Sequence, residues 1–292
     1  MALNKPLSHF IDIDLVHKTV EEEFQLQDAK VLGEGMSGAV FLVKNPVGKT
    51  DFAALKVFRG KRESDSSSSS NSDHSQERAE KLFRTEVNVM RQCQHPNLMP
   101  MLNSVRMADS LCILMPYMSE GSLNRIIHRL TTHQAIGYFF QIADALNYLH
   151  KKKIIHGDIK PNNVLINSVN QAVLSDFGLS KCVPNQSVKL FIDYGTKGFR
   201  APETFEDERV CPFKVDIYAL GVTFWAMILK KKPGPSVNYL HHVNRASLIP
   251  CLKQVFESLL NKDPSKRISV SLGSDESKKE SIKIKKERGQ PS

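Results

Sequence analysis

Cysteine is scarce in this sequence, and the cysteines present form no familiar pattern. The 292 residues include five cysteines, which are odd in number, widely separated and never arranged as C-x-x-C. Disulfide-bonded domains usually carry an even number of cysteines, and structural zinc sites usually carry closely spaced pairs. We therefore expect neither a disulfide framework nor a zinc site, and a reducing compartment is the natural setting.

Long hydrophobic runs are also absent. The longest apolar stretches, such as residues 217–229, are shorter than the roughly 20 residues that a membrane-spanning helix needs. Residues 1–23 lack the basic start and the continuous apolar run of a signal peptide. We expect a soluble, intracellular protein without a membrane span, located in the cytoplasm, with a nuclear location left open.

Acidic residues are in the minority. The chain holds 40 lysines and arginines against 31 aspartates and glutamates, a formal net charge of +9. Such an excess can attract nucleic acid or acidic surfaces. The basic residues are nevertheless spread along the whole chain and form no stripe with interleaved aromatic residues. Because only the net charge and the tail at 278–288 support nucleic-acid binding, we do not expect nucleic acid as a partner.

Two segments are too polar to join a core. Residues 61–76 are rich in serine, and residues 271–292 consist mostly of lysine, serine and glutamate. Such compositions cannot bury enough apolar surface to fold. They predict a disordered serine-rich insert and a disordered basic tail. A spacer is the simplest interpretation of the insert, and a regulatory partner that binds the insert or the tail is the alternative.

The remaining chain has the pattern of a sheet followed by helices, and its 41% apolar residues suffice for two lobes that share a cleft. Short apolar runs at 24–31, 39–43 and 52–58 predict an antiparallel sheet. Apolar residues at three- and four-residue steps predict helices at 77–93 and 132–150. The fold class is therefore α+β: a small N-terminal sheet with one long helix, followed by a larger, mainly helical lobe.

A glycine-rich loop is the first candidate for chemistry. Residues 33–40 read G-E-G-M-S-G-A-V and fit G-x-G-x-x-G-x-V, in which glycines let backbone amides approach phosphate oxygens. A Rossmann dinucleotide site has similar glycines at the start of a helix. Here residues 39–43 continue as a predicted strand, so we expect the glycines to cap a hairpin that folds over a triphosphate.

A lysine in the third predicted strand is the second candidate. Residues 53–56 read A-A-L-K, and a lysine in a strand interior between apolar neighbours seldom lacks a partner. Residues 53–56 also resemble the motif V-A-I-K, and this resemblance implies that Lys56 places its ammonium on the α- and β-phosphates of a nucleotide. Glu86, in the middle of the predicted helix, is the expected partner, and Glu80 is the competing candidate.

Two short segments carry the strongest pattern. Residues 155–165 read I-H-G-D-I-K-P-N-N-V-L, and residues 174–178 read L-S-D-F-G. They resemble the catalytic loop H-R-D-x-x-x-x-N and the metal-binding turn D-F-G of the eukaryotic protein kinase family. Together with the glycine loop and Lys56, the resemblance runs from about residue 24 to residue 267.

The resemblance implies a bilobed, protein-kinase-like fold with defined boundaries. The expected divisions are an N-terminal extension at 1–23, a kinase domain at 24–270 with its N-lobe at 24–115, hinge at 116–121 and C-lobe at 122–270, the insert at 61–76 and the tail at 271–292. Asp216 and Gly221 would lie on a buried central helix, and the last helices of the family's large lobe would be shortened.

The resemblance also implies roles for single residues. Phosphoryl transfer needs a base that orients the acceptor hydroxyl, cations that neutralise phosphate charge and oxygen ligands for Mg²⁺. By resemblance Asp158 is the base, Lys160 touches the transferring phosphate, and Asn163 and Asp176 bind Mg²⁺, or Mn²⁺ in its place. Lys56 and Glu86 complete the catalytic set. The expected nucleotide-binding residues are Leu32, Gly33, Glu34, Gly35, Gly38, Val40, Ala54, Lys56, Met115, Pro116, Met118 and Leu165.

The same motifs indicate the type of substrate. Lys160 in D-I-K-P-N-N and Thr196 in G-T-K-G-F resemble the serine/threonine branch, with dual specificity left open. The expected enzyme transfers the γ-phosphate of ATP to serine and threonine hydroxyls of protein substrates in intracellular signalling. The alternative is a pseudokinase, a scaffold that binds nucleotide without efficient transfer. Pseudokinases usually lack one of the catalytic groups, and none is missing here.

One position departs from the family pattern. Gly157 stands where most members have arginine, the usual receptor for a phosphorylated activation segment. We therefore expect segment 176–203 to reach its active form without phosphorylation. The alternative receptors would be Lys181, Lys189 and Lys197. The resemblance also pairs Glu203 with Arg267.

Overall fold

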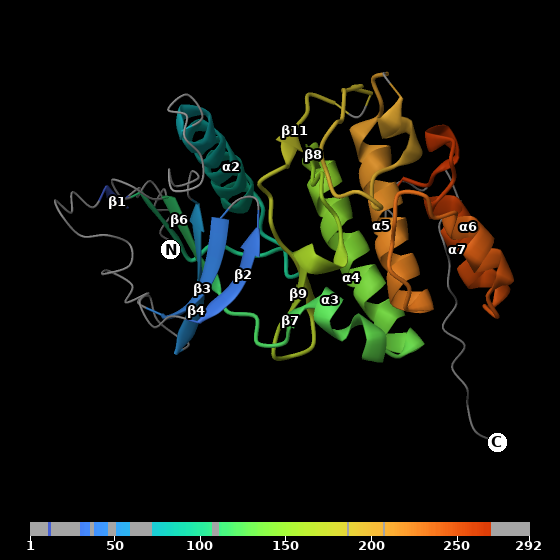
Figure 1. Ribbon diagram of the computed structural model, residues 1–292, viewed down its shortest axis with the longest axis horizontal. Coiled ribbons are helices and arrows are strands. Elements are labelled where there is room, and N and C mark those ends of the chain that lie inside the picture. Colours follow the sequence, from blue (N-terminus) through green and yellow to red (C-terminus); the bar gives the residue numbers. More distant parts are fainter. Residues whose placement is uncertain are drawn as a thin grey trace, which may run out of the picture.

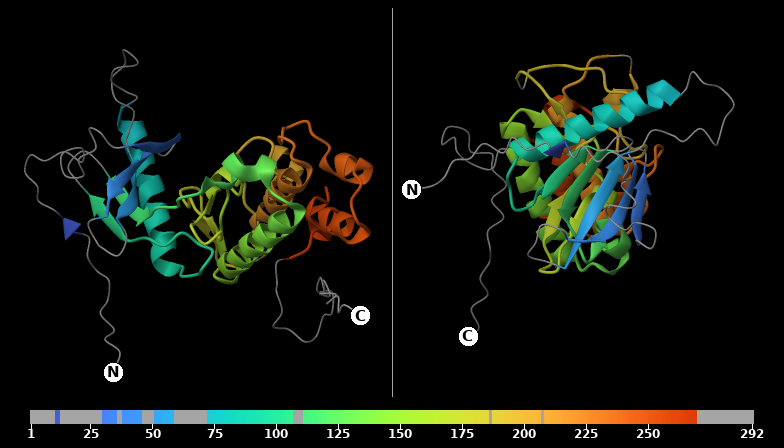
Figure 2. Two further views of the ribbon diagram at one scale, coloured as in Figure 1. Left: turned by 90° about the horizontal axis from the view of Figure 1, so that it is seen from below. Right: turned by 90° about the vertical axis from the view of Figure 1, so that its left-hand side faces the viewer.

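A computed structural model describes residues 11–12, 30–35, 38–45, 51–58, 72–106, 111–185, 187–206 and 208–269. In this part of the chain, a sheet with one long helix forms an N-terminal lobe, and helices with short strands form a larger C-terminal lobe (Figure 1). The left view of Figure 2 shows the two lobes side by side, and in the right view the N-terminal sheet and α2 lie in front of the C-terminal lobe. The predicted two-lobed α+β architecture is confirmed.

The N-terminal lobe contains a six-stranded sheet in the order β1-β5-β6-β4-β3-β2, with α2 (Ser72–Gln92) beside it. All neighbouring strands are antiparallel except the parallel pair β1 and β5. The strands are β1 (Ile11–Asp12), β2 (Val31–Gly35), β3 (Gly38–Lys44), β4 (Phe52–Phe58), β5 (Asn103–Arg106) and β6 (Leu111–Pro116).

Strand β4 is central, and its two faces have different neighbours because side chains alternate along a strand. Leu55 lies in a small apolar cluster on one face of the sheet. Phe58, on the other face, makes an edge contact with Phe83 of α2, with ring centroids 5.5 Å apart. Lys56 shares the face of Phe58 and lies 4.9 Å from that ring. The alternation therefore turns the Lys56 side chain toward α2.

The C-terminal lobe is mainly helical. Its helices are α3 (Leu123–Ile126), α4 (Thr132–Lys151), α5 (Pro212–Leu229), α6 (Tyr239–Arg245) and α7 (Pro250–Leu259). Its short strands are β7 (Gly121–Ser122), β8 (Ile154–Ile155), β9 (Val164–Ile166), β10 (Ala172–Leu174) and β11 (Lys181–Cys182). Its 3₁₀ turns are η3 (Ile127–Arg129), η4 (Pro161–Asn163), η5 (Pro202–Phe205) and η6 (Pro264–Lys266).

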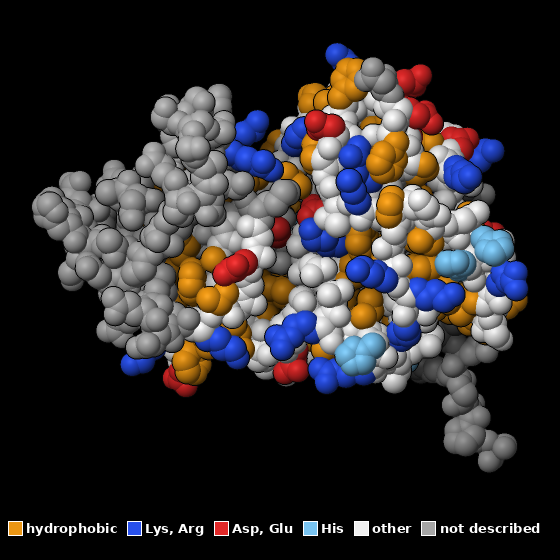
Figure 3. Space-filling view, in the orientation of Figure 1, with side chains coloured by type: hydrophobic (Ala, Val, Ile, Leu, Met, Phe, Trp, Pro, Cys, Tyr) orange, Lys and Arg blue, Asp and Glu red, His pale blue; other side chains and the backbone are white. Residues whose placement is uncertain are grey.

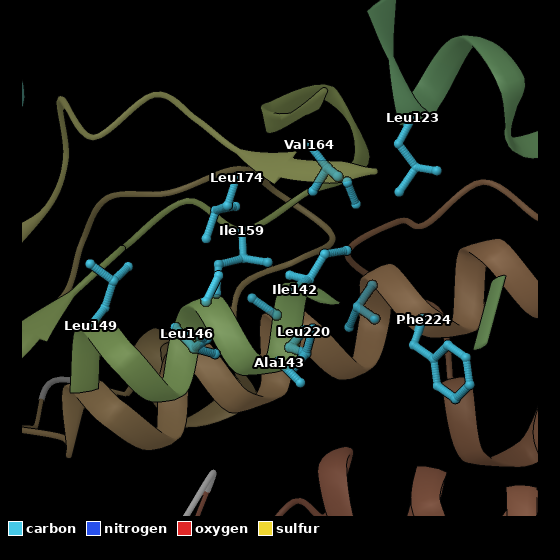
Figure 4. Packing of buried hydrophobic residues seen from close by; sticks show 14 of the residues in the cluster. Leu123, Ile142, Ala143, Leu146, Leu149, Ile159, Val164, Leu174, Leu220 and Phe224 are labelled. Atoms are coloured by element: carbon cyan, nitrogen blue, oxygen red, sulfur yellow. The ribbon is translucent and has the colours of Figure 1, made fainter. Parts of the chain in front are cut away.

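Helices α4 and α5 pack together in the middle of this lobe. The α4 helix begins with a capping box, in which Thr131 and Gln134 exchange side-chain to backbone hydrogen bonds. Phe139 of α4 stacks on Phe224 of α5, with ring centroids 4.2 Å apart. Figure 4 shows Leu220 of α5 among the buried side chains of both helices. This core supports the loops that carry the polar residues described below.

Helix α5 meets the length and composition of a membrane span, with 18 residues and a mean hydropathy of 1.3. However, 83% of it is buried inside the protein, so it is the core helix of the C-terminal lobe. The apolar stretch at 217–229 is the later part of this longer helix, which begins at Pro212. Burial, and not shortness, accounts for its apolar character.

Two predicted boundaries in the N-terminal lobe were wrong. Helix α2 begins at Ser72, although residues up to 76 were predicted to be disordered. Its polar first turn has a composition like that of the insert before it, which hides the start of the helix in the sequence. Strand β2 runs to Gly35, so part of the predicted glycine loop is strand. Predictions for residues 24–29, 61–71 and 271–292 fall outside the described residues.

Candidate active site

The glycine-rich hairpin joins β2 and β3, and Gly35 pairs with Gly38 across it. Gly38 has a φ of +131°, and a Cβ at this residue would lie 1.9 Å from a backbone oxygen of β4, so only glycine fits. A Cβ on Gly33 or Gly35 would instead meet no described atom within 4 Å. Leu32 is half-buried and Glu34 is exposed. The hairpin is therefore tight against β4 on one side and open at β2.

Lys56 joins the two lobes through two carboxylates. Its Nζ lies 2.6 Å from Oε2 of Glu86 on α2 and 2.7 Å from Oδ1 of Asp176 in the C-terminal lobe. Lys56 and Glu86 are both buried. The predicted Lys56–Glu86 pair is present, whereas the competing candidate, Glu80, pairs with Arg84 at 2.6 Å. Lys56 is thus held by one carboxyl group from each lobe.

Burial and charge act in opposite directions on the pKa values of this trio. Burial lowers the pKa of Lys56, but the charges of Glu86 and Asp176 outweigh it and raise that pKa. Burial raises the pKa of Asp176, but Lys56 outweighs it and holds the pKa below its ordinary value. Burial raises the pKa of Glu86 to about 7 against the attraction of Lys56. Glu86 is therefore the member that titrates near neutral pH.

Asp158 accepts hydrogen bonds from three side chains around it. Its carboxylate lies 2.6 Å from the Lys160 ammonium, 2.7 Å from the Thr196 hydroxyl and 3.1 Å from the Asn163 amide nitrogen. The Thr196 backbone N–H also donates to it, at 3.1 Å, and Lys160 donates to the Thr196 hydroxyl at 2.7 Å. Sequence reasoning used Thr196 to identify the branch and expected a structural role for it, but missed this contact, which no local pattern reveals.

Asp216 of α5 holds the loop that carries Asp158. Its carboxylate accepts the backbone N–H groups of His156 at 2.8 Å and Gly157 at 2.9 Å, and it lies 3.0 Å from His150 Nε2. The side chain is buried in a helix that is otherwise almost wholly apolar. Sequence reasoning placed Asp216 on this helix but gave it no partner; a carboxylate in such a setting is itself a signal that it needs one.

Asn163 and Asp176, the expected metal ligands, lie on neighbouring segments. The backbone N–H and hydroxyl of Ser175, which precedes Asp176, donate to the Asn163 carbonyl at 2.8 and 2.9 Å. The Asn163 side-chain nitrogen donates to Asp158, which leaves the amide oxygen as its ligand atom. Among the described residues, no three His, Cys, Asp or Glu side chains form a metal site. An amide oxygen and an ionised carboxylate are oxygen ligands that suit Mg²⁺ completed by water and phosphate oxygens.

The expected adenine-contacting residues come from neighbouring strands. Val40 lies opposite Lys56, Ala54 opposite Met115 and Ala53 opposite Pro116. The first two pairs share one face of the sheet, because side chains alternate along a strand.

Two further residues expected to contact the nucleotide lie outside this sheet. Met118 accepts the Gly121 N–H at 3.0 Å after β6, and Leu165 lies half-buried in β9. Figure 3 shows acidic and basic side chains together in the hollow between the lobes.

The end of segment 176–203, the expected activation segment, is fixed by a buried ion pair. The Arg267 guanidinium binds both carboxylate oxygens of Glu203, at 2.5 and 2.7 Å, and both residues are buried. The predicted Glu203–Arg267 pair is therefore present. Two such hydrogen bonds fix the orientation of the carboxylate as well as its distance from the guanidinium. The pair therefore ties η5 to the turn after α7.

Comparison with known proteins agrees with this geometry. The Protein kinase domain family matches residues 26–276. The chain is 31% identical over 270 residues to an Aurora kinase of Debaryomyces hansenii, covering 87% of this chain and 61% of the relative. It is 30% identical over 217 residues to mitogen-activated protein kinase kinase kinase 13 of Mus musculus, covering 73% of this chain and 20% of the relative.

A plant relative is similar to the same extent. The leucine-rich repeat receptor-like serine/threonine/tyrosine-protein kinase SOBIR1 of Arabidopsis thaliana is 30% identical over 270 residues, covering 87% of this chain and 40% of the relative. The chain thus spans between a fifth and three fifths of the length of these three relatives. On the strength of the family match and of these relatives, the chain belongs to the eukaryotic protein kinase family, in its serine/threonine branch.

Proposed function

We propose that this protein is an active kinase that transfers the γ-phosphate of ATP to serine and threonine hydroxyls of protein substrates, with Mg²⁺ as its metal and Mn²⁺ as an alternative. One observation carries the proposal. Asp176 contacts Lys56 from one side of the cleft and is joined through Ser175 to Asn163, which contacts Asp158. Every group with a chemical task in phosphoryl transfer therefore belongs to one connected network.

Each residue of the network has a task that suits its charge. Lys56 would bind the α- and β-phosphates, with Glu86 holding it in place. Asp176 and Asn163 would hold the divalent metal, which supplies neutralisation of phosphate charge. The hydrophobic face at Val40, Ala54 and Met115 would contact the adenine, with the other predicted nucleotide contacts around it.

Asp158 would orient the attacking hydroxyl. The substrate oxygen forms a bond to the γ-phosphorus, the bond from that phosphorus to the bridging oxygen of ADP breaks, and the substrate proton passes to the Asp158 carboxylate. Lys160, at 2.6 Å from Asp158, would donate to the transferring phosphate. The hydrogen bonds that Thr196 donates to Asp158 fix the orientation of the Asp158 carboxylate.

The wider setting follows from the same proposal. We place the kinase domain at 24–270 and the activity inside the cell, in the cytoplasm or the nucleus. The names of the relatives support serine and threonine as acceptors, and one relative's name also includes tyrosine. Labelled phosphoserine and phosphothreonine, without phosphotyrosine, are therefore the products that this proposal predicts.

The test is the transfer of labelled γ-phosphate from ATP with Mg²⁺ to a mixed basic-protein substrate. We expect labelled phosphoserine and phosphothreonine with the wild type, and a loss of about a hundredfold or more with Asp158→Asn and with Lys56→Met. Asp144→Asn, an exposed aspartate on α4, is the matched control and should leave transfer unchanged. No transfer by a folded, nucleotide-binding wild type would favour the pseudokinase alternative.

A further inference from the structure

The activation segment approaches the catalytic loop very closely at Gly157. This residue has a φ of +83°, and a Cβ built on it would lie 2.8 Å from the Leu179 carbonyl oxygen and 3.0 Å from Cε2 of the Tyr194 ring. Gly195, with a φ of +103°, faces it: a Cβ there would lie 3.3 Å from the Gly157 carbonyl oxygen. The Tyr194 ring therefore lies directly beside the position where other kinases carry a side chain.

The Tyr194 ring is held from its face by a cation. Lys181 Nζ lies 4.3 Å from the ring centroid, within the range of a favourable cation–π contact. Burial lowers the pKa of Lys181, opposed by Asp193. One of the three lysines considered as phosphate receptors is thus engaged with an aromatic face.

The nearby arginine is engaged as well. The Arg200 guanidinium donates to the carbonyl oxygens of Ile192 at 2.9 Å, Asp193 at 3.2 Å and Thr204 at 2.7 Å. Ile192 itself is buried. These contacts are with neutral backbone groups, so this part of the segment is docked without a negatively charged ligand.

The Tyr194 hydroxyl contributes no hydrogen bond to this arrangement. Its oxygen is buried and has no partner among the described residues. Burial raises the pKa of the phenol, and Asp216 and Asp193 add to this, so the hydroxyl stays neutral. The ring, and not the hydroxyl, makes the contact.

We propose that Tyr194, clamped between Lys181 and Gly157, is a positioning residue that docks the activation segment on the catalytic loop in place of an arginine–phosphate contact. Thr196, two residues further on, is thereby brought to Asp158, which it contacts through both its hydroxyl and its N–H. This inference rests on the proposed function and specifies its regulation: the kinase is active without a phosphate on the segment.

The test compares four variants with the wild type in steady-state transfer. Tyr194→Ala should lower kcat about tenfold to hundredfold, the cost of misplacing a catalytic group, with KM for ATP little changed because the nucleotide contacts lie elsewhere. Tyr194→Phe should keep kcat within about twofold, since the hydroxyl has no partner. Lys181→Met should lower kcat about twofold to fivefold. Phe191→Ala removes an exposed aromatic ring from the same segment and should have no effect.

Two further measurements separate docking from catalysis. Hydrogen exchange of the amides of residues 187–200 should speed up in Tyr194→Ala and not in Tyr194→Phe, with the rest of the C-terminal lobe unchanged. Wild type treated with a protein phosphatase should keep its activity.

Three results would overturn the inference: a Tyr194→Ala variant with normal kcat, a Tyr194→Phe variant as poor as the alanine variant, or a phosphatase-treated enzyme that regains activity only after phosphorylation. A wild type without transfer would instead overturn the proposed function, and the exchange measurement would still report on Tyr194.

Discussion

Glu86 is a buried carboxyl, and among the contacts described Lys56 is the only cation close to it. The protonation of Glu86 should therefore change the stability of the fold with pH. Its pKa in the folded protein is about 7, above the ordinary 4.5. At a pH between about 4.5 and about 7, Glu86 binds a proton in the folded state but not in the unfolded state. The carboxyl group therefore contributes its full stabilisation below pH 4.5, and this contribution is lost as the pH rises through about 7.

We predict that the wild type loses stability relative to Glu86→Gln as the pH rises from about 4.5 to about 7. Glutamine keeps the shape of the side chain but cannot titrate. Urea unfolding of both proteins at several pH values measures the difference in free energy. Glu80→Gln is the control, because the Glu80 carboxylate lies on the outer part of the same helix beside Arg84. Parallel pH profiles for the wild type and Glu86→Gln would show that Glu86 is already ionised throughout this range.

The buried Glu203–Arg267 pair offers a second residue-scale prediction. Arg267→Met should lower the free energy of unfolding by about 3–5 kcal/mol, because it leaves the Glu203 carboxylate buried without its partner. Adding Glu203→Leu should recover much of that loss. Lys266→Met is the neighbouring control and should change little, since Lys266 lies 3.9 Å from Asp263 at the surface. Equal effects of Lys266→Met and Arg267→Met would contradict the role of the pair.

At this scale the sequence could predict pairs that the family motifs or helix periodicity place together. Lys56 with Glu86, and Glu203 with Arg267, are of this kind. The contact of Thr196 with Asp158 and the two N–H groups bound by Asp216 could not be predicted, because each depends on how a loop is turned in the folded lobe. Residue type and spacing do not encode that direction.

At the scale of elements, two helices each contain a glycine in a different setting. A Cβ on Gly137 of α4 would meet no described atom within 4 Å. A Cβ on Gly221 of α5 would lie 2.8 Å from Leu259 Cβ and 2.9 Å from Leu260 Cδ2. Gly221 therefore lets the end of α7 approach α5 closely, whereas Gly137 has no such packing role.

The same substitution should thus have opposite effects at the two positions. Gly137→Ala should raise the free energy of unfolding by up to about 1 kcal/mol, because alanine restricts the unfolded chain and favours the helix. Gly221→Ala should lower it by about 1–3 kcal/mol, because the extra methyl group overpacks the contact between α5 and α7. Urea unfolding measures both values, and a stabilised Gly221→Ala variant would mean that α7 is free to move away from α5.

Elements were predictable where both a repeating pattern and an end signal were present. Helix α4 was predicted at 132–150 and is Thr132–Lys151, since its capping residues and apolar steps agree. Helix α2 begins earlier than predicted because its first turn is polar and resembles the insert before it. Strand β1 was not predicted at all: two residues carry no periodicity, and it forms only through pairing with β5.

At the scale of the whole molecule, the cleft between the lobes is crossed by charge. Lys56 from the sheet contacts Asp176 of the C-terminal lobe at 2.7 Å, while Glu86 holds it from α2. A nucleotide that binds Lys56 through its phosphates must share the ammonium with Asp176, and a divalent metal on Asp176 would offset the change. Binding of nucleotide and metal should therefore stabilise both lobes at once, and not one lobe alone.

This coupling leads to a prediction for thermal unfolding. A ligand that binds only the folded state at 100 times its Kd adds about 2.7 kcal/mol, which for a domain of this size raises Tm by roughly 5–10 °C. ATP with Mg²⁺ should give a shift of this size in the wild type and in the Asp144→Asn control. Chelation of the metal, or Lys56→Met, should remove most of the shift.

Asp158→Asn should keep the shift and lose transfer, because Asp158 acts on the acceptor hydroxyl and lies outside the residues expected to bind nucleotide. A wild type that shows neither shift nor transfer would contradict both nucleotide binding and catalysis at this cleft. A thermal shift without transfer would mean that the nucleotide binds to the network between the lobes and that the catalytic step itself fails.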